Sequence, residues 1–269
     1  MPEAMLSLNT VKELRNVCAL SFCYICGETF AVDADKDSDH VPPKTCFDKR
    51  DRDMPLKLQT HRKCNGKYNL IDEKIGQLIA LKRSVVPPAR NRRLEFKRIL
   101  IPGWSASINA ISNVDIKGAI RRWVSGFHAA LYREPLPVDT QFGIETPFPS
   151  ARFTDTGIQV DQLKPQHRMF VELLKKNRAA RNIDQISTNK KKLKYECVWV
   201  QLDNAEGWIC IFALDIYGWK DLGDVNNFVP RGCAGFYLLP SREAPSSAAL
   251  STKISLLIPN YSPFDPFGG

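Results

Sequence analysis

The sequence predicts an α+β protein made of three parts. A strand–strand–helix module is expected at residues 1–85, a basic and largely helical connecting region at 86–190, and a β-rich domain at 191–269. Three observations lead to this division. The hydrophobic pattern changes from alternating to helical spacing within the first part, two amphipathic helical stripes occupy the second, and runs of aromatic and β-branched residues fill the third.

Two pairs of soft metal ligands stand in the first part, each pair separated by two residues: Cys23 and Cys26, then His61 and Cys64. Two tight turns that each present two such donors are what a tetrahedral Zn²⁺ requires. The segment 18–81 has few large apolar side chains, so zinc would supply folding free energy on the order of 10 kcal/mol. We therefore predict a structural zinc site that staples this module, with Cys46 or Cys18 as the alternative to His61.

The 34 residues between Cys26 and His61 are expected to form a hairpin. Its strands are predicted at 38–41 and 56–60, with Leu56, Leu58 and Thr60 on one face and a charged loop between the strands. A helix is predicted next, because Ile71, Ile75, Leu78 and Ile79 follow helical spacing. Pro87 and Pro88 end it.

Asp39 and His40 lie next to each other, and Asn65 directly follows the last predicted zinc ligand. A strand–strand–helix fold has no structural need for these residues. A carboxylate beside an imidazole, with an amide oxygen nearby, is typical of a Mg²⁺ site that has a general base next to it.

In combination, these motifs resemble the zinc-bearing branch of the HNH nucleases, also called ββα-metal or His-metal finger nucleases. In that branch a Cys-x-x-Cys knuckle precedes an Asp-His-(Val/Ile)-x-Pro strand, and a second Cys/His-x-x-Cys-Asn opens the helix, often with an acidic pair eight residues later. The resemblance covers roughly residues 18–81. The matching residues are Cys23, Cys26, Asp39, His40, Pro42, Pro43, His61, Cys64, Asn65, Asp72 and Glu73.

The sequence departs from this pattern in three ways. It has no Asn between Val41 and Thr60, Asn65 stands where many family members have a His, and His61 replaces a more usual Cys. The last two changes keep the donor chemistry. Without the middle Asn, a backbone carbonyl of the charged loop would have to orient the His40 ring.

The resemblance implies a metal-dependent endonuclease that hydrolyses phosphodiester bonds of DNA, with RNA as the other possible substrate. Asp39 and Asn65 would hold one Mg²⁺ or Mn²⁺, and His40 would be the general base. Glu73 would face the same ion or its water shell, whereas Asp72 is expected to be solvated. Two other functions fit parts of the pattern: a zinc-stabilised nucleic-acid-binding protein without cleavage activity, and a protein-binding module whose aromatic-rich β-domain recruits a partner.

Composition favours a nucleic-acid partner. The chain has 38 basic and 29 acidic residues and a formal charge of +9. It shows neither a secretory apolar segment at the N-terminus nor a run of eighteen apolar residues, so we expect a cytoplasmic protein with no membrane partner. Eight cysteines in that compartment favour metal ligands and free thiols over disulfides. The sequence leaves the oligomeric state open.

The basic excess is concentrated in two stretches. Lys82–Arg98 has seven basic residues and one acidic residue, and Lys175–Lys194 has eight basic residues and one acidic residue. Phosphate neutralisation is the natural use of such stretches, and a solvated helix face or loop is the alternative for each. The first stretch follows the predicted catalytic helix and is expected to bind DNA through Lys82, Arg83, Arg90, Arg92, Arg93, Lys97 and Arg98.

The remainder of the chain predicts structure more than chemistry. One amphipathic helix is expected from Ile116 to Leu131, before Pro135, and another after Pro165. Strands are expected at 195–202, 208–217 and 235–239, and Cys197, Cys210 and Cys233 in these apolar runs are expected to be buried thiols.

Overall fold

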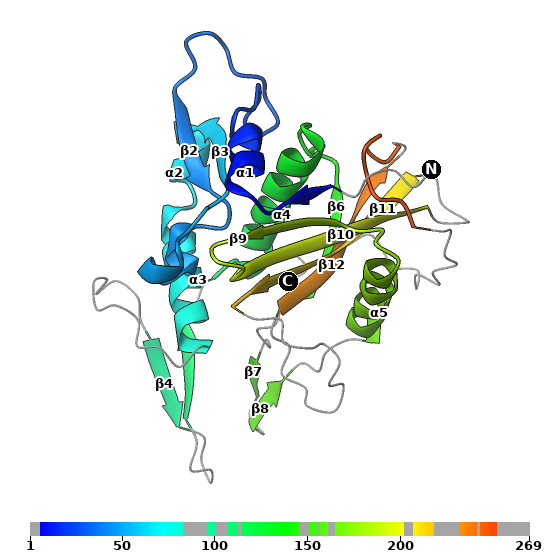
Figure 1. The fold of residues 1–269 in the computed structure, drawn as a ribbon. Coiled ribbons are helices and arrows are strands. Elements are labelled where there is room, and N and C mark those ends of the chain that lie inside the picture. The colour runs from blue at the N-terminus through cyan, green and yellow to red at the C-terminus, as the bar shows by residue number, and fades with distance from the viewer. Residues whose placement is uncertain are drawn as a thin grey trace.

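The computed structural model describes residues 6–82, 96–100, 107–111, 114–145, 151–154, 157–160, 165–201, 207–217, 232–240 and 243–251, and it confirms an α+β fold (Figure 1). The helices are α1 (Val11–Cys18), α2 (Arg62–Gly66), α3 (Asn69–Lys82), α4 (Ile116–Tyr132) and α5 (Pro165–Ala179). The strands are β1 (Ser7–Leu8), β2 (Lys36–His40), β3 (Lys57–His61), β4 (Phe96–Leu100), β5 (Ser107–Ile111), β6 (Gln141–Glu145), β7 (Ala151–Thr154), β8 (Gly157–Val160), β9 (Asp184–Thr188), β10 (Leu193–Gln201), β11 (Gly207–Ile216) and β12 (Gly232–Pro240).

A mixed sheet of six strands forms the centre of the molecule, in the order β1-β9-β10-β11-β12-β6. β1 runs parallel to β9, and the other neighbours are antiparallel. Both faces are covered, because Tyr195 and Trp199 of β10 pack in the cluster that contains α4, while Val198 and Val200 pack against α5. Strands buried on both faces explain the nearly continuous apolar runs from which β10 and β11 were predicted.

The hairpin module, which consists of β2, β3, α2 and α3, is built as the alternating pattern predicts. β2 and β3 pair antiparallel, with Asp39 opposite Leu58 and His40 opposite Lys57. The apolar positions Leu56 and Leu58 are fully buried and Lys57 is exposed. The helix expected after Asn65 is present as α3, and α2 precedes it as a separate short helix that contains Cys64 and Asn65.

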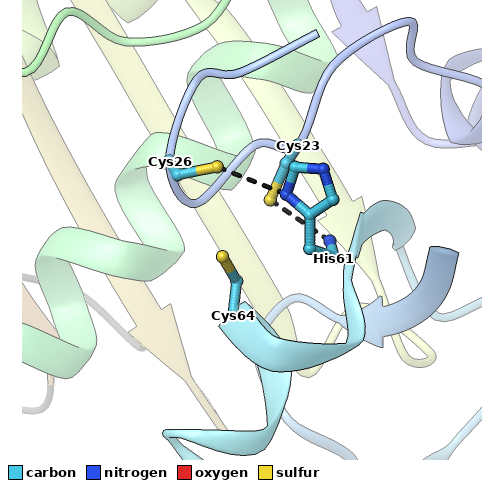
Figure 2. A group of neighbouring side chains, drawn as sticks. All are labelled: Cys23, Cys26, His61 and Cys64. Carbon is cyan, nitrogen blue, oxygen red and sulfur yellow. Dashed lines mark hydrogen bonds between the residues drawn. The ribbon is translucent and has the colours of Figure 1, made fainter. Parts of the chain in front are cut away.

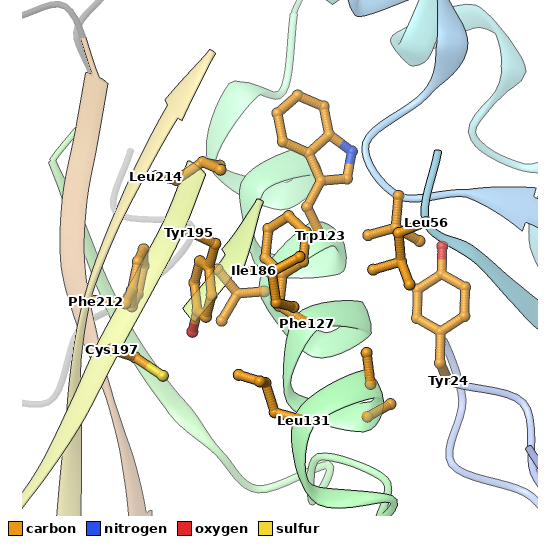
Figure 3. Packing of buried hydrophobic residues seen from close by; sticks show 14 of the residues in the cluster. Tyr24, Leu56, Trp123, Phe127, Leu131, Ile186, Tyr195, Cys197, Phe212 and Leu214 are labelled. Carbon is orange, nitrogen blue, oxygen red and sulfur yellow. The ribbon is translucent and has the colours of Figure 1, made fainter. Parts of the chain in front are cut away.

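α4 lies between the hairpin module and the sheet (Figure 3). Its side chains Trp123 and Phe127 belong to one core cluster that includes Leu56 on the hairpin side and Tyr195 on the sheet side. Gly126 permits the close approach to the hairpin, because a Cβ atom there would lie 2.8 Å from Val41 Cγ1. The helix begins at an Asp115 cap and ends before Arg133, as its apolar stripe predicts.

The expected division into three parts does not follow the packing. The region 86–190 contains the strands β4 to β9 as well as two helices, and its strands β6 and β9 belong to the central sheet. The expected boundary at residue 190 therefore lies in the β9–β10 turn. Residues from all three expected parts share one core, so strand pairing over long sequence distances decided the architecture.

Among the described residues, no helix combines the length and apolar character that crossing a membrane requires.

Candidate functional site

Four side chains converge where the hairpin meets α2: Cys23, Cys26, His61 and Cys64 (Figure 2). Their ligand atoms all lie within 4.8 Å of one another, and Cys26 Sγ is 3.4 Å from His61 Nδ1. Tetrahedral zinc with these ligands places the donor atoms roughly 3.5–3.8 Å apart. This group, which we call the clamp, could therefore hold a metal ion such as zinc.

Local backbone structure sets the positions of the clamp ligands. The first pair lies on a knuckle in which the amide of Gly27 donates to the carbonyl of Cys23 at 2.8 Å, and Gly27 adopts a left-handed φ of 78°. The second pair spans a strand-to-helix junction, because His61 ends β3 and Cys64 lies in α2. Two short-range turns thus present two donors each, as the spacing predicts.

Hydrogen bonds prepare Cys23 to be a thiolate. Burial raises the pKa of this thiol. Hydrogen bonds from the Thr60 hydroxyl and from backbone amides, including that of His61, together lower it by more, so the pKa of Cys23 lies below its usual value. Burial raises the pKa of Cys26 to about 12, and the neighbouring thiols add to the increase. Metal binding would therefore release protons from the clamp.

The two alternative zinc ligands lie outside the clamp. Cys18 Sγ contacts the carbonyl of Leu14 at 3.0 Å in α1, and Cys46 is buried in the core. Among the described residues, the clamp is the one group of three or more His, Cys, Asp and Glu donors close enough to share an ion. Cys197, Cys210 and Cys233 are buried and form no disulfide, as expected.

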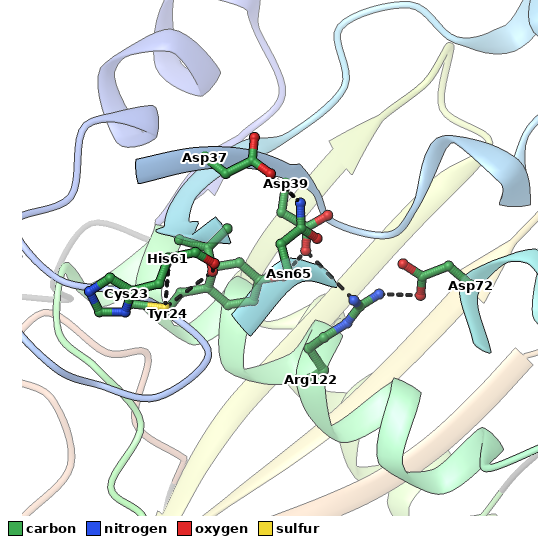
Figure 4. A network of polar contacts seen from close by, with 9 residues as sticks. Cys23, Tyr24, Asp37, Asp39, His61, Asn65, Asp72 and Arg122 are labelled. Carbon is green, nitrogen blue, oxygen red and sulfur yellow. Dashed lines mark hydrogen bonds and ion pairs between the residues drawn. The ribbon is translucent and has the colours of Figure 1, made fainter. Parts of the chain in front are cut away.

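Asp39 lies in a buried polar network between the hairpin and α4 (Figure 4). Its Oδ2 accepts a hydrogen bond from the Tyr24 hydroxyl and lies 3.8 Å from Arg122 Nη1. Arg122 also forms an ion pair with Asp72. Burial raises the pKa of Asp39 and raises that of Asp72 to about 6, while the Arg122 charge opposes both shifts.

Asn65 reaches the same face of the hairpin as Asp39. Its Nδ2 donates to Asp37 Oδ2 at 3.0 Å, and Asp37 and Asp39 are two positions apart in β2, so they share a face. Figure 4 shows Asn65 beside both carboxylates. Carboxylate and amide oxygens suit a hard divalent cation, so these donors fit a Mg²⁺ or Mn²⁺ ion by type. The Asp39 oxygen that contacts Arg122 and Tyr24 would have to be shared with or released to such an ion.

His40 projects from the opposite face, because successive strand side chains alternate. Burial and then the charges of Lys57, Lys44 and Arg52 lower its pKa to about 4. His40 is therefore neutral at pH 7 and surrounded by cations. The structure brings Asp39 and Asn65 to one face of the hairpin and places His40 on the other.

The acidic pair of α3 differs from the expectation in one member. Asp72 was expected to be solvated, but it is buried because Arg122 compensates its charge. Glu73 is half-buried, and its Oε1 has no hydrogen-bond partner among the described residues.

Most of the stretch predicted to bind DNA lies outside the described residues, namely Arg83, Arg90, Arg92 and Arg93. Lys82 ends α3, and Lys97 and Arg98 lie on β4, paired with Ala110 and Asn109 of β5.

Sequence reasoning missed Arg122, Tyr24 and the cations around His40. A weak signal was present for Arg122, because it stands between Ala119 and Gly126 at helical spacing, on the flank of the apolar stripe of α4. Lys57 could have been noticed as the cross-strand neighbour of His40.

The fold and the clamp define an α+β protein with a four-ligand site suited to a metal such as zinc. No protein-family model, curated protein or solved structure matches the chain.

Proposed function

We propose that this protein is a metal-dependent endonuclease that hydrolyses phosphodiester bonds of DNA. The observation that carries the proposal is the position of Asn65. It directly follows the clamp ligand Cys64, and it contacts Asp37 on the face of β2 that also carries Asp39. The clamp therefore fixes an amide next to two carboxylates, a donor set that a structural metal site does not need.

The residues of the chain would divide the chemistry between them. Asp39 and Asn65 would hold the divalent ion, which when bound supplies Lewis-acid stabilisation of negative charge on the phosphate. His40, neutral at pH 7, would accept a proton from a water molecule as the water oxygen bonds to phosphorus and the bond to the 3′ oxygen breaks. Lys44, Arg52 and Lys57 would bind the phosphate groups near His40.

Arg122 and Tyr24 favour a second candidate function. Both contact the same Asp39 oxygen, which compensates its charge within the protein. A zinc-stabilised nucleic-acid-binding protein without cleavage activity would need Asp39 only in this structural role. The alternation of β2, which directs His40 away from Asp39, is consistent with the same function.

Plasmid nicking separates these two functions. The full-length, zinc-loaded protein should convert supercoiled plasmid to nicked and linear forms in Mg²⁺ or Mn²⁺, and His40→Ala should lower the rate by about 10² to 10⁴. His167→Ala in α5, which covers the far face of the sheet, is the matched control and should keep the native rate. Equal nicking by native protein and His40→Ala, or none by either with the fold intact, would exclude the nuclease proposal.

A further inference from the structure

The turn between β9 and β10 has an unusual backbone. Asn189, Lys190 and Lys191 have φ angles of 52°, 54° and 61°, and the Lys192 amide closes the turn on the Asn189 carbonyl at 3.0 Å. Positive φ at both central positions is the geometry in which hairpins prefer Asn-Gly. Lysine is disfavoured at these positions, so the backbone geometry of the turn does not explain the presence of Lys190 and Lys191.

Contacts to the hairpin module hold this turn in place. Lys190 Nζ donates to the Arg50 carbonyl at 2.7 Å, and the Asp48 amide donates to the Tyr217 hydroxyl at 2.6 Å. The Tyr217 amide in turn donates to the Lys192 carbonyl at 2.6 Å. The turn therefore lies against the loop that connects β2 to β3, as Figure 1 shows.

The loop on which the turn rests is itself basic on its exposed side. Lys44, Arg50 and Arg52 of the loop are exposed, and so is Lys57, the first residue of β3. Lys44, Arg52 and Lys57 contribute to the cationic surroundings of His40. The acidic residues of the loop compensate only part of this charge, since Asp51 is buried, Asp48 lies 3.9 Å from Arg50, and Asp53 is exposed.

We propose that Lys190 and Lys191 extend this loop surface into one basic ridge that binds the phosphate backbone of duplex DNA. The ridge consists of Lys44, Arg50, Arg52, Lys57, Lys190 and Lys191, and it runs from His40 to the central sheet. Its charge is complementary to a polyphosphate, and it assigns the lysine cluster of the second basic stretch to DNA binding. The inference deepens the proposed function, because it names the surface that would carry the substrate to His40.

The same basic stretch supplies a matched control. Lys176 lies in the last turn of α5, Arg181 follows the end of this helix, and both are exposed and precede β9. The Lys190–Lys191 turn follows the end of β9, about 13 Å further along the strand. Lys190→Gln with Lys191→Gln and Lys176→Gln with Arg181→Gln remove equal charge from the two ends of β9.

The experiment measures binding of the full-length, zinc-loaded protein to a fluorescent DNA duplex at several salt concentrations, without added Mg²⁺ or Mn²⁺. The turn variant should bind about tenfold more weakly or worse. The negative slope of log association constant against log salt should become less steep by about 2, since each substitution removes roughly one phosphate contact. The α5 variant should match the native protein. Equal effects of the two variants, or tighter binding of native protein to anionic phosphatidylserine vesicles than to duplex, would overturn the ridge.

Lys191→Gly keeps the test valid if the glutamine variants fold poorly. Glycine adopts the left-handed conformation without penalty, so this variant should raise the melting temperature by about 2 °C while it weakens duplex binding. Unchanged binding in a stabilised Lys191→Gly protein would also overturn the ridge. Binding and nicking are separate readouts: duplex binding through the turn without nicking excludes only the nuclease, and nicking with turn-independent binding excludes only the ridge.

Discussion

Arg122 is the residue that joins three elements at the candidate site. It extends from α4 to Asp39 on β2 and Asp72 on α3, and its guanidinium lies 4.4 Å from the ring centroid of Tyr68. All three charged groups are buried, and one cation faces two carboxylates. A buried pair of this kind is held by mutual compensation, so the loss of one partner leaves an uncompensated charge in the core.

Replacing Arg122 by Met should therefore destabilise the protein by about 3–5 kcal/mol, because Asp39 and Asp72 would lose their shared cation. Arg122→Lys keeps the charge and should cost less. Urea unfolding of the zinc-loaded protein gives the comparison. The neighbouring Arg121 is exposed and contacts the Phe142 ring at 5.0 Å, so Arg121→Met should cost under about 1 kcal/mol. Similar losses for Arg121→Met and Arg122→Met would contradict this role of Arg122.

The clamp and the Arg122 network differ in how far the sequence could predict them. The clamp ligands come in two pairs with two residues between the members, so local spacing predicted them, with only His61 left open against Cys46 or Cys18. Arg122 is 50 residues from Asp72, and no local pattern connects them. Long-range packing of α4 brings them together, and neither periodicity nor motif reading reports that contact.

At the scale of elements, we predict that the fold of the knuckle and α2 depends on a metal ion bound by the clamp. Cys64→Ser should lose the metal and lower the melting temperature, because the clamp supplies binding free energy that stabilises the fold. Cys18→Ser is the matched control, since Cys18 is also a partly buried free thiol but lies in α1 outside the clamp.

Elemental analysis of the purified variants gives the readout, with one zinc per chain expected for native protein and Cys18→Ser. Chelation should lower the melting temperature of these two proteins to that of Cys64→Ser. A Cys64→Ser protein that retains a full equivalent of zinc would show that the clamp is not the metal site.

The close approach of α4 to the hairpin depends on Gly126. A Cβ atom there would lie 2.8 Å from Val41 Cγ1 and 3.2 Å from Tyr24 Cε2. Gly126→Ala should therefore destabilise the protein by about 1–3 kcal/mol, although alanine favours helices. Gly66→Ala in α2 meets no atom within 4 Å and should be neutral or slightly stabilising. Urea unfolding measures both, and a stabilised Gly126→Ala protein would contradict the close contact.

Elements with strong periodicity were predictable, and those that depend on distant partners were not. α4, α5, the hairpin and β10 to β12 follow the apolar patterns of their own segments. β6 and β9 do not, because their place in the sheet comes from pairing with β12 and β10. The middle of the chain was therefore expected to be mainly helical, although it contributes two strands to the central sheet.

At the scale of the whole molecule, one core connects the hairpin module to the central sheet. α4 contributes to both sides, and its His128 lies at the sheet side with Nδ1 3.1 Å from the Tyr237 hydroxyl. Tyr132 and Trp199 contact the same ring, and Nε2 lies 3.4 Å from Glu134 Oε1. The ring is fully buried, and this burial lowers the pKa of His128 although Glu134 opposes the shift. The folded protein therefore keeps His128 neutral at pH values where the unfolded chain protonates it.

This difference predicts how stability depends on pH. Below the usual histidine pKa of 6.5, the unfolded state binds a proton at His128 that the folded state does not bind. The contribution of His128 to the free energy of unfolding is therefore fully present above pH 6.5 and decreases on acidification. The loss approaches about 1.4 kcal/mol per pH unit until the folded pKa is reached.

Protonation of the clamp thiols and of His40 adds losses in the same direction, so the comparison needs a variant that differs only at this ring. His128→Asn keeps a polar group near Tyr237 and does not titrate; it should be less stable than the native protein at pH 7.5, and the gap should narrow as the pH falls to 5.5. Urea unfolding of zinc-saturated protein at each pH measures the gap, and a gap that stays constant would show that His128 is not the buried neutral group that links α4 to the sheet.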